Sequence, residues 1–234
     1  MKYILSKEIL EKFPTTSLAV ITLRDIDNSG NNNEVRTLLR SAEVEIRKNM
    51  SGIQISEHPR IKMWREVYSA FGSKPSKYSC SIEAMIKRIM KNEIIPEIND
   101  VVNLYNFISL KHLISVGGDD ADKIDGEVVL SIANGDEKFI EIGKTESNPP
   151  DRGEVVFKDD KDILGRRWNW RQGDKTKITK ESRNVNLQIE GVYLVARKEI
   201  EEAGRDLISS VRKFFKVETE FYFLNNEDRF VEIK

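Results

Sequence analysis

The chain has 234 residues, of which 38 are basic and 39 acidic, so its formal net charge at pH 7 is −1. A chain of this length can bury about 70% of its unfolded surface and needs neither a disulfide nor a structural metal to fold. One cysteine and two histidines allow no internal disulfide and are too few for a Cys/His zinc cluster, so no metal site is predicted.

The N-terminal part of the sequence predicts helices around one buried strand. Ser6 is predicted to cap a short helix that ends before Pro14, because proline disfavours helical geometry in the residue before it. The continuous apolar run at residues 18–23 is short and β-branched, which favours a strand buried on both faces. Apolar residues at helical spacing predict three further helices, over residues 34–48, 58–71 and 81–90, the last capped by Ser81.

The next apolar run, residues 101–110, contains two amides. Buried amides need hydrogen-bond partners, so Asn103 and Asn106 are either structural braces or site residues. Beyond this run the sequence reads mainly as sheet, with a turn at 117–120. Strands are predicted over residues 127–132, 139–142, 155–157 and 186–197, a helix over 199–215, and a closing hairpin from 220–224 and 230–233.

This order of elements predicts an α+β fold, in which layers of mixed β-sheet are flanked by helices. Residues 1–234 are predicted to form a single domain, with residues 1–59 as an N-terminal extension packed on a 60–234 core. The first residues lack the apolar core and cleavage site of a signal peptide, and no segment approaches the roughly 20 apolar residues of a membrane span. Together with the free Cys80, this predicts a cytoplasmic protein without a membrane partner.

The balanced net charge hides an uneven distribution. Residues 60–92 carry eight basic and two acidic side chains, a net charge of +6, whereas residues 166–183 carry seven and two, a net charge of +5. The two segments either line a site for a phosphate-bearing ligand or are solvated faces whose acidic partners lie elsewhere in the fold. Charge alone leaves both interpretations open.

The motifs of common catalytic sites are absent from the sequence. There is no GxGxxG or GxxxxGK[ST] phosphate loop and no GxSxG elbow, so no nucleotide cofactor is predicted. Two histidines outside any such motif argue against a histidine-activated nucleophile, and Cys80 is predicted to be a small buried residue. Acidic residues are too numerous for spacing to select a catalytic pair.

The most unusual segment is 166–176, where two of the three tryptophans alternate with Asn169 and Arg171. Such a segment can stack on a base or an aromatic side chain while it donates hydrogen bonds to phosphate or carboxylate. Alternatively, it is the end of a strand in which Trp168 and Trp170 cover the core and Asn169 points to solvent.

Several ordered motifs between about residues 60 and 195 resemble one family. They are KPSKY at 74–78, SIEAMIKR at 81–88, VVNLYNFISL at 101–110, GGDDADKI at 117–124, WNWR at 168–171 and TKIT at 176–179. In this order they are similar to the B3/4 domain of the β subunit of bacterial phenylalanyl-tRNA synthetase, which also occurs as a freestanding protein. The catalytic core of that synthetase has no counterpart in the sequence, so a complete tRNA ligase is not expected.

The resemblance implies a layered α+β core and a small editing chamber that hydrolyses the ester of a tyrosine wrongly attached to tRNA. It thus implies a deacylase acting in trans on the 3′ end of aminoacyl-tRNA, without a cofactor. Asn106 matches an asparagine in the pocket motif Val-Asp-Val-Thr-Asn-Tyr, and Glu190 matches the glutamate that recognises the tyrosine hydroxyl, so these two are the expected catalytic residues. The expected substrate-binding residues are Asn103, Gly117, Gly118, Trp168, Asn169, Trp170, Arg171 and Thr176.

Two family features are replaced in this sequence. A histidine within Pro-x-His-Ala-Phe-Asp is absent where the chain has residues 116–120, and a Gly-x-Met-Gly-Gly loop is replaced by residues 168–171. The resemblance then implies a water positioned by Asn106 or main-chain groups and helped by the adjacent ribose hydroxyl, with Arg171 on the terminal phosphate. Two other functions stay open, namely a non-catalytic module that binds tRNA or an amino acid, and a metabolic enzyme that uses the pocket for another substrate.

Overall fold

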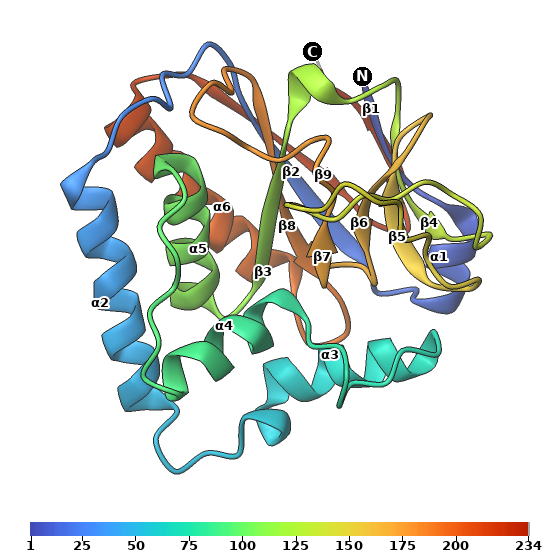
Figure 1. Cartoon of the computed structure of the whole chain (residues 1–234), viewed down its shortest axis with the longest axis horizontal. Coiled ribbons are helices and arrows are strands. Elements are labelled where there is room, and N and C mark those ends of the chain that lie inside the picture. The colour runs from blue at the N-terminus through green and yellow to red at the C-terminus, as the bar shows by residue number, and fades with distance from the viewer. Residues whose placement is uncertain (234) are drawn as a thin grey trace.

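The computed structural model describes residues 1–233 and shows two β-sheets flanked by helices (Figure 1). The predicted α+β class with mixed sheet is confirmed. The α-helices of this part of the chain are α1 (Lys7–Lys12), α2 (Asn33–Asn49), α3 (Pro59–Ala70), α4 (Ser81–Met90), α5 (Asp100–His112) and α6 (Arg197–Phe215). Within residues 1–233, no helix is both long enough and apolar enough to span a membrane.

The strands form one six-stranded and one four-stranded sheet. In the six-stranded sheet the order is β10 (Phe230–Glu232), β1 (Lys2–Leu5), β4 (Val128–Ile132), β5 (Val155–Lys158), β6 (Ile163–Arg166) and β7 (Arg171–Gln172), and β1 runs parallel to β4. In the four-stranded sheet the order is β3 (Ser115–Asp120), β8 (Val185–Gly191), β2 (Ser17–Leu23) and β9 (Thr219–Leu224), all antiparallel. The first 59 residues thus supply one strand, β1 or β2, to each sheet.

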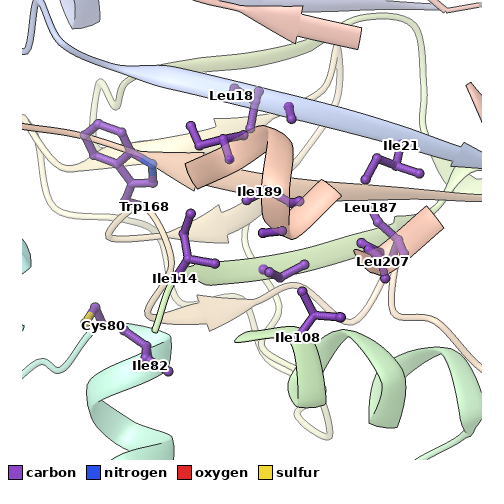
Figure 2. Close-up of a cluster of buried hydrophobic side chains, with 14 of the residues drawn as sticks. Leu18, Ile21, Cys80, Ile82, Ile108, Ile114, Trp168, Leu187, Ile189 and Leu207 are labelled. Carbon is purple, nitrogen blue, oxygen red and sulfur yellow. The ribbon is translucent and has the colours of Figure 1, made fainter. Parts of the chain in front are cut away.

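One face of the four-stranded sheet packs against helices. Every residue of β2 and β8 is buried, as the prediction for 18–23 requires. Because side chains alternate along a strand, Ile21, Leu187 and Ile189 share one face. They pack with Ile108 of α5 and Leu207 of α6 (Figure 2). This apolar layer fixes the sheet to its helices and leaves the other face for different contacts.

The opposite face of β8 is polar. Asn186, Gln188 and Glu190 alternate with the apolar residues and are all buried. This face looks toward the six-stranded sheet, since Gln188 Nε2 donates a hydrogen bond of 3.1 Å to the Tyr3 hydroxyl on β1. Buried polar groups need such partners, so the space between the sheets holds hydrogen-bonded side chains of β8 beside the buried apolar Leu18 and Val20 of β2.

The predicted turn at residues 117–120 is wrong. These residues belong to β3, the edge strand beside β8. Gly118 is needed for close packing: a Cβ there would lie 2.5 Å from Cδ2 of Leu187 and 3.1 Å from the main-chain oxygen of Asn186. Gly118 therefore marks a close approach of two strands, which local sequence does not distinguish from a turn.

The predicted closing hairpin is also wrong. Its two strands exist, but β9 pairs with β2 in the four-stranded sheet and β10 pairs with β1 in the six-stranded sheet. Residues 225–229 connect the two sheets. Residues 139–142 form no strand apart from one isolated bridge between Glu141 and Gly173, and the strand predicted over 186–197 ends at Gly191.

Of the helix starts predicted at Ser6, His58 and Ser81, the first two are confirmed. Ser6 and His58 each accept a hydrogen bond from a main-chain N–H in the first turn of α1 and α3. The cap position of α4 is Cys80, and Ser81 is already helical, which corrects the predicted cap. The Ser81 hydroxyl is instead 3.1 Å from the hydroxyl of Ser115 on β3, so it ties the helix to the sheet.

Candidate functional site

A cavity of about 220 Å³ lies between the two sheets, and α4 and α5 contribute to its wall. Eight of the ten predicted site residues line it. They are Asn106 on α5, Gly117 and Gly118 on β3, Glu190 on β8, and the run Trp168, Asn169, Trp170 and Arg171 that connects β6 to β7. Segments far apart in the sequence thus meet at one concave site, which is the usual form of a ligand pocket.

Two predicted substrate-binding residues, Asn103 and Thr176, lie outside the cavity lining. Asn103 is buried and its Oδ1 accepts a hydrogen bond of 3.1 Å from the main-chain N–H of Ile98. Thr176 is fully buried and its hydroxyl donates a bond of 2.5 Å to Asp119. Asn103 therefore stabilises the start of α5, and Thr176 contributes to the site by its hydrogen bond to the carboxylate of Asp119.

Asn169 is the centre of a polar network at the cavity. Its Nδ2 donates to Glu190 Oε2 at 2.6 Å and to the Ser115 hydroxyl at 3.1 Å. Its Oδ1 accepts from the hydroxyl of Tyr68 on α3 at 2.9 Å. Asn169 is therefore held from three elements, and it does not point to solvent as one reading of the sequence proposed.

Glu190 is buried without a basic partner among residues 1–233. Burial raises its pKa to about 8, while the Asn169 hydrogen bond lowers it and the negative charge of Asp119 raises it further. Its Oε1 has no hydrogen-bond partner within residues 1–233. A cavity-lining carboxyl with one free oxygen can accept from a ligand donor or, when protonated, donate to an acceptor.

Asp119 is a second buried carboxyl on the lining, which sequence reasoning missed. It accepts hydrogen bonds from Thr176 at 2.5 Å, Gln188 Nε2 at 2.8 Å and Gln172 Nε2 at 3.3 Å. Burial raises its pKa, and the bonds from Thr176, Gln188 and Gln172 oppose that shift. The signal that would have found this polar wall is the alternation of Asn186, Gln188 and Glu190 along one face of an otherwise apolar strand.

Asn106 provides the other free polar group. It is half-buried on α5, lines the cavity, and makes no side-chain hydrogen bond within residues 1–233. Its neighbour Tyr105 lines the same wall, and burial raises the pKa of the Tyr105 hydroxyl. A free amide beside aromatic surface is suited to orient a carbonyl or a water molecule. The chain's two histidines, His58 and His112, do not line the cavity.

The two tryptophans of the 166–176 segment have different roles. Trp168 is buried and packs edge-on against Trp64 at 5.3 Å and Phe13 at 5.5 Å between ring centroids, so it covers the core. Trp170 is half-buried at the cavity, 4.9 Å from the ring of Tyr78. The interpretation that the tryptophans cover the core therefore applies to Trp168, and the interpretation that they face a ligand applies to Trp170.

The basic segments 60–92 and 166–183 are largely neutralised within the fold. Ten of their fifteen basic side chains contact an acidic group. Arg166 and Arg167 share Glu154, and Arg171 on the cavity lining is 3.0 Å from Glu141. The interpretation with acidic partners elsewhere in the fold therefore accounts for most of this charge. No group of three or more His, Cys, Asp and Glu within residues 1–233 is arranged to hold a metal ion.

A family model described as "B3/4 domain" matches residues 63–215. The chain belongs to the B3/4 domain family. The matched range contains every residue of the cavity lining, whereas β1, β2, β9 and β10 lie outside it. The search of curated proteins found no match to this chain.

One solved structure similar to this B3/4 protein is an N-terminal fragment of the phenylalanyl-tRNA synthetase β subunit from Pyrococcus horikoshii. The two are 10% identical with a TM-score of 0.48, and the match covers 93% of this chain and 49% of the other. The chain therefore spans about half the length of that fragment.

Proposed function

We propose that this B3/4 protein hydrolyses the ester bond of mischarged aminoacyl-tRNA in trans. The observation that carries the proposal is the meeting of Asn106 and Glu190, from α5 and β8, in one cavity inside the B3/4 range, each with a free polar group. The cavity is small and has aromatic walls, which suits an aminoacyl group. The proposed substrate belongs to translation, which agrees with the expected cytoplasmic location.

The chemistry relies on positioning. The oxygen of a water molecule attacks the ester carbonyl carbon, the bond from that carbon to the ribose oxygen breaks, and the water proton passes to the ribose oxygen through the adjacent ribose hydroxyl. Asn106 would donate to the carbonyl oxygen or hold the water, and pre-organised donors of this kind are worth about 10²–10³ in rate. This chemistry needs no histidine as a base, and no histidine lines the cavity.

Glu190 and Arg171 would hold the two ends of the aminoacylated terminus. Asn169 fixes one oxygen of Glu190, which leaves Oε1 to select the amino acid. Arg171 is exposed at the lining and lies 5.1 Å from the centre of the Trp170 ring. In exchange for Glu141, its guanidinium would pair with the terminal phosphate of the tRNA.

A panel of mischarged tRNAs tests this function. We expect release of the amino acid from at least one member, with a loss of tenfold or more in Asn106→Ala and in Glu190→Gln while tRNA binding is retained. The matched controls are Asn49→Ala and Glu66→Gln, whose side chains are exposed on α2 and α3 and do not line the cavity. Ester loss no faster than in buffer across the whole panel refutes the proposal.

A non-catalytic binding module with the same fold is the second candidate. The observation that favours it is the self-contained network of Asn169, Ser115 and Tyr68, in which most polar groups of the cavity already satisfy one another. If the protein is such a module, we expect no hydrolysis of any tRNA in the panel. A tRNA or a free amino acid should still bind, and Glu190→Gln should weaken that binding.

A further inference from the structure

The buried carboxylates of this protein fall into two groups. Eight acidic side chains within residues 1–233 are buried. Five of these form salt bridges with Lys or Arg, namely Glu43, Glu83, Asp120, Glu154 and Asp159. Both carboxylate oxygens of Asp100 accept a hydrogen bond of 3.0 Å from the main-chain N–H of Asn32, the cap residue of α2. Asp119 and Glu190 remain, and both line the same cavity.

These two carboxylates lie at different ends of the cavity. Glu190 is opposite Ser115 in the β3–β8 ladder, and Asp119 is four residues beyond Ser115 on β3, so about 13 Å of strand lies between the Cα atoms of Ser115 and Asp119. Gly117 lies between them on the same face, and a Cβ added to it would meet no atom within 4 Å. The space beside Gly117 is therefore open, and the negative charge of Asp119 acts on Glu190 from the same cavity.

The protein does not supply a cation to either group within residues 1–233. Arg171 on the lining is engaged by Glu141 at 3.0 Å and stacks on Trp170. Glu190 is 5% exposed and its Oε1 has no hydrogen-bond partner in the described chain. Burial without a compensating charge favours the protonated form of Glu190, whereas a bound cation would favour the ionised form and release that proton.

We infer that the cavity selects a ligand with a primary ammonium group, bound directly by Oε1 of Glu190 and stabilised by the charge of Asp119. The ring of Tyr105 on the lining adds to this preference, because ring faces attract cations. The inference deepens the proposed function and rests on it for the identity of the ester. In an aminoacyl ester, the ammonium is either the free α-amino group or the side chain of a basic amino acid.

Four amides separate these sources without any bond to hydrolyse. Lysinamide carries both ammonium groups, norleucinamide the α group, Nα-acetyllysinamide the side-chain group, and Nα-acetylnorleucinamide neither. Isothermal titration calorimetry of the whole protein at pH 7 measures each affinity. We expect at least one ammonium-bearing amide to bind tenfold or more tightly than Nα-acetylnorleucinamide, and the stronger of the two single-ammonium amides identifies the source.

Asp119→Asn and Glu190→Gln test the carboxylates, with Glu66→Gln and Asp136→Asn as exposed controls. We expect each of the first pair to lose most of the preference for ammonium and the controls to keep it. Equal binding of the four amides by the unaltered protein, or no binding, overturns the inference whether or not a variant folds. Ammonium-selective binding without hydrolysis of any tRNA ester would sustain this inference while the proposed function fails.

Discussion

Glu154 and Glu190 are both buried glutamates beside the 166–170 segment, yet their surroundings differ. Glu154 accepts hydrogen bonds from Arg166 Nε at 2.9 Å and Nη2 at 2.8 Å, and from the main chain and side chain of Arg167. Glu190 accepts one, from Asn169 at 2.6 Å, and has no basic partner in residues 1–233. Burial of a carboxylate therefore does not mark a site by itself, whereas burial beside a cavity without a cation does.

The comparison also explains the basic run at residue 166. Arg167 and Trp168 have φ angles of 46° and 66°, in the left-handed region that costs energy for residues other than glycine. The Glu154 ion pairs and the hydrogen bond of 2.7 Å from Trp168 N–H to the Val155 carbonyl hold this turn. Arg166 and Arg167 therefore shape the wall that presents Asn169, and they are not available for phosphate.

The largest expected effect is on the paired glutamate. Glu154→Ala leaves the buried guanidinium of Arg166 without a carboxylate and that of Arg167 with Asp151 alone, so we expect the free energy of unfolding to fall by about 3–5 kcal/mol. Urea denaturation followed by circular dichroism measures this, with exposed Glu146→Ala as the control. A loss below about 1 kcal/mol would mean that the ion pairs are not what holds the turn.

For Glu190, the glutamate without a basic partner, we expect its contribution to the free energy of unfolding to depend on pH. Its folded pKa of about 8 lies above the ordinary 4.5, so between these values the folded state holds a proton that the unfolded state loses. The free energy of unfolding should then fall as pH rises, by up to about 1.4 kcal/mol per unit, with the loss complete near pH 8.

Glu190→Gln removes the pH dependence that Glu190 causes. The difference in free energy of unfolding between the unaltered protein and the variant, measured at each pH, therefore isolates the contribution of Glu190. The nearby titratable groups are Tyr68 on α3, Cys80 before α4 and Asp119 on β3. Burial raises the pKa of Tyr68 well above 10 and that of Cys80 to about 12, so neither titrates between pH 5 and 8. Parallel pH profiles for the two proteins would show that Glu190 is ionised throughout.

The sequence predicted every helix except α5 and most of the cavity lining, and it failed where the structure depends on contacts between distant residues. Amphipathic spacing located α2, α3, α4 and α6 within a few residues, because each buries one face. The pairing of β9 and β10 with different sheets depends on contacts some 200 residues away, which no local pattern contains. The same holds for Asp119, whose role requires Gln172, Thr176 and Gln188 to be brought beside it.

The neighbouring glycines of β3, Gly117 and Gly118, lie on opposite faces of the strand and differ in the space around them. Gly118 faces Leu187 and the helices, and Gly118→Ala would place a Cβ 2.5 Å from Leu187 Cδ2. We expect a loss of about 1–3 kcal/mol in stability from this overpacking. Thermal unfolding measures it against Gly117→Ala, for which the structure has room. Equal losses in the two variants would contradict the assignment of the two faces of β3.

Gly117 lines the same cavity as Glu190 and the space beside it is open, so filling that space tests whether the carboxyl acts through the cavity. Gly117→Val adds a β-branched side chain that suits a strand and meets no atom within 4 Å at Cβ, so stability should stay equal or rise by up to about 1 kcal/mol. Hydrolysis of the responsive mischarged tRNA should fall at least tenfold because the new side chain occupies the ligand's place. A folded Gly117→Val protein with full activity would place the reaction outside this cavity, and Glu190 would then be an unpaired carboxyl without a ligand.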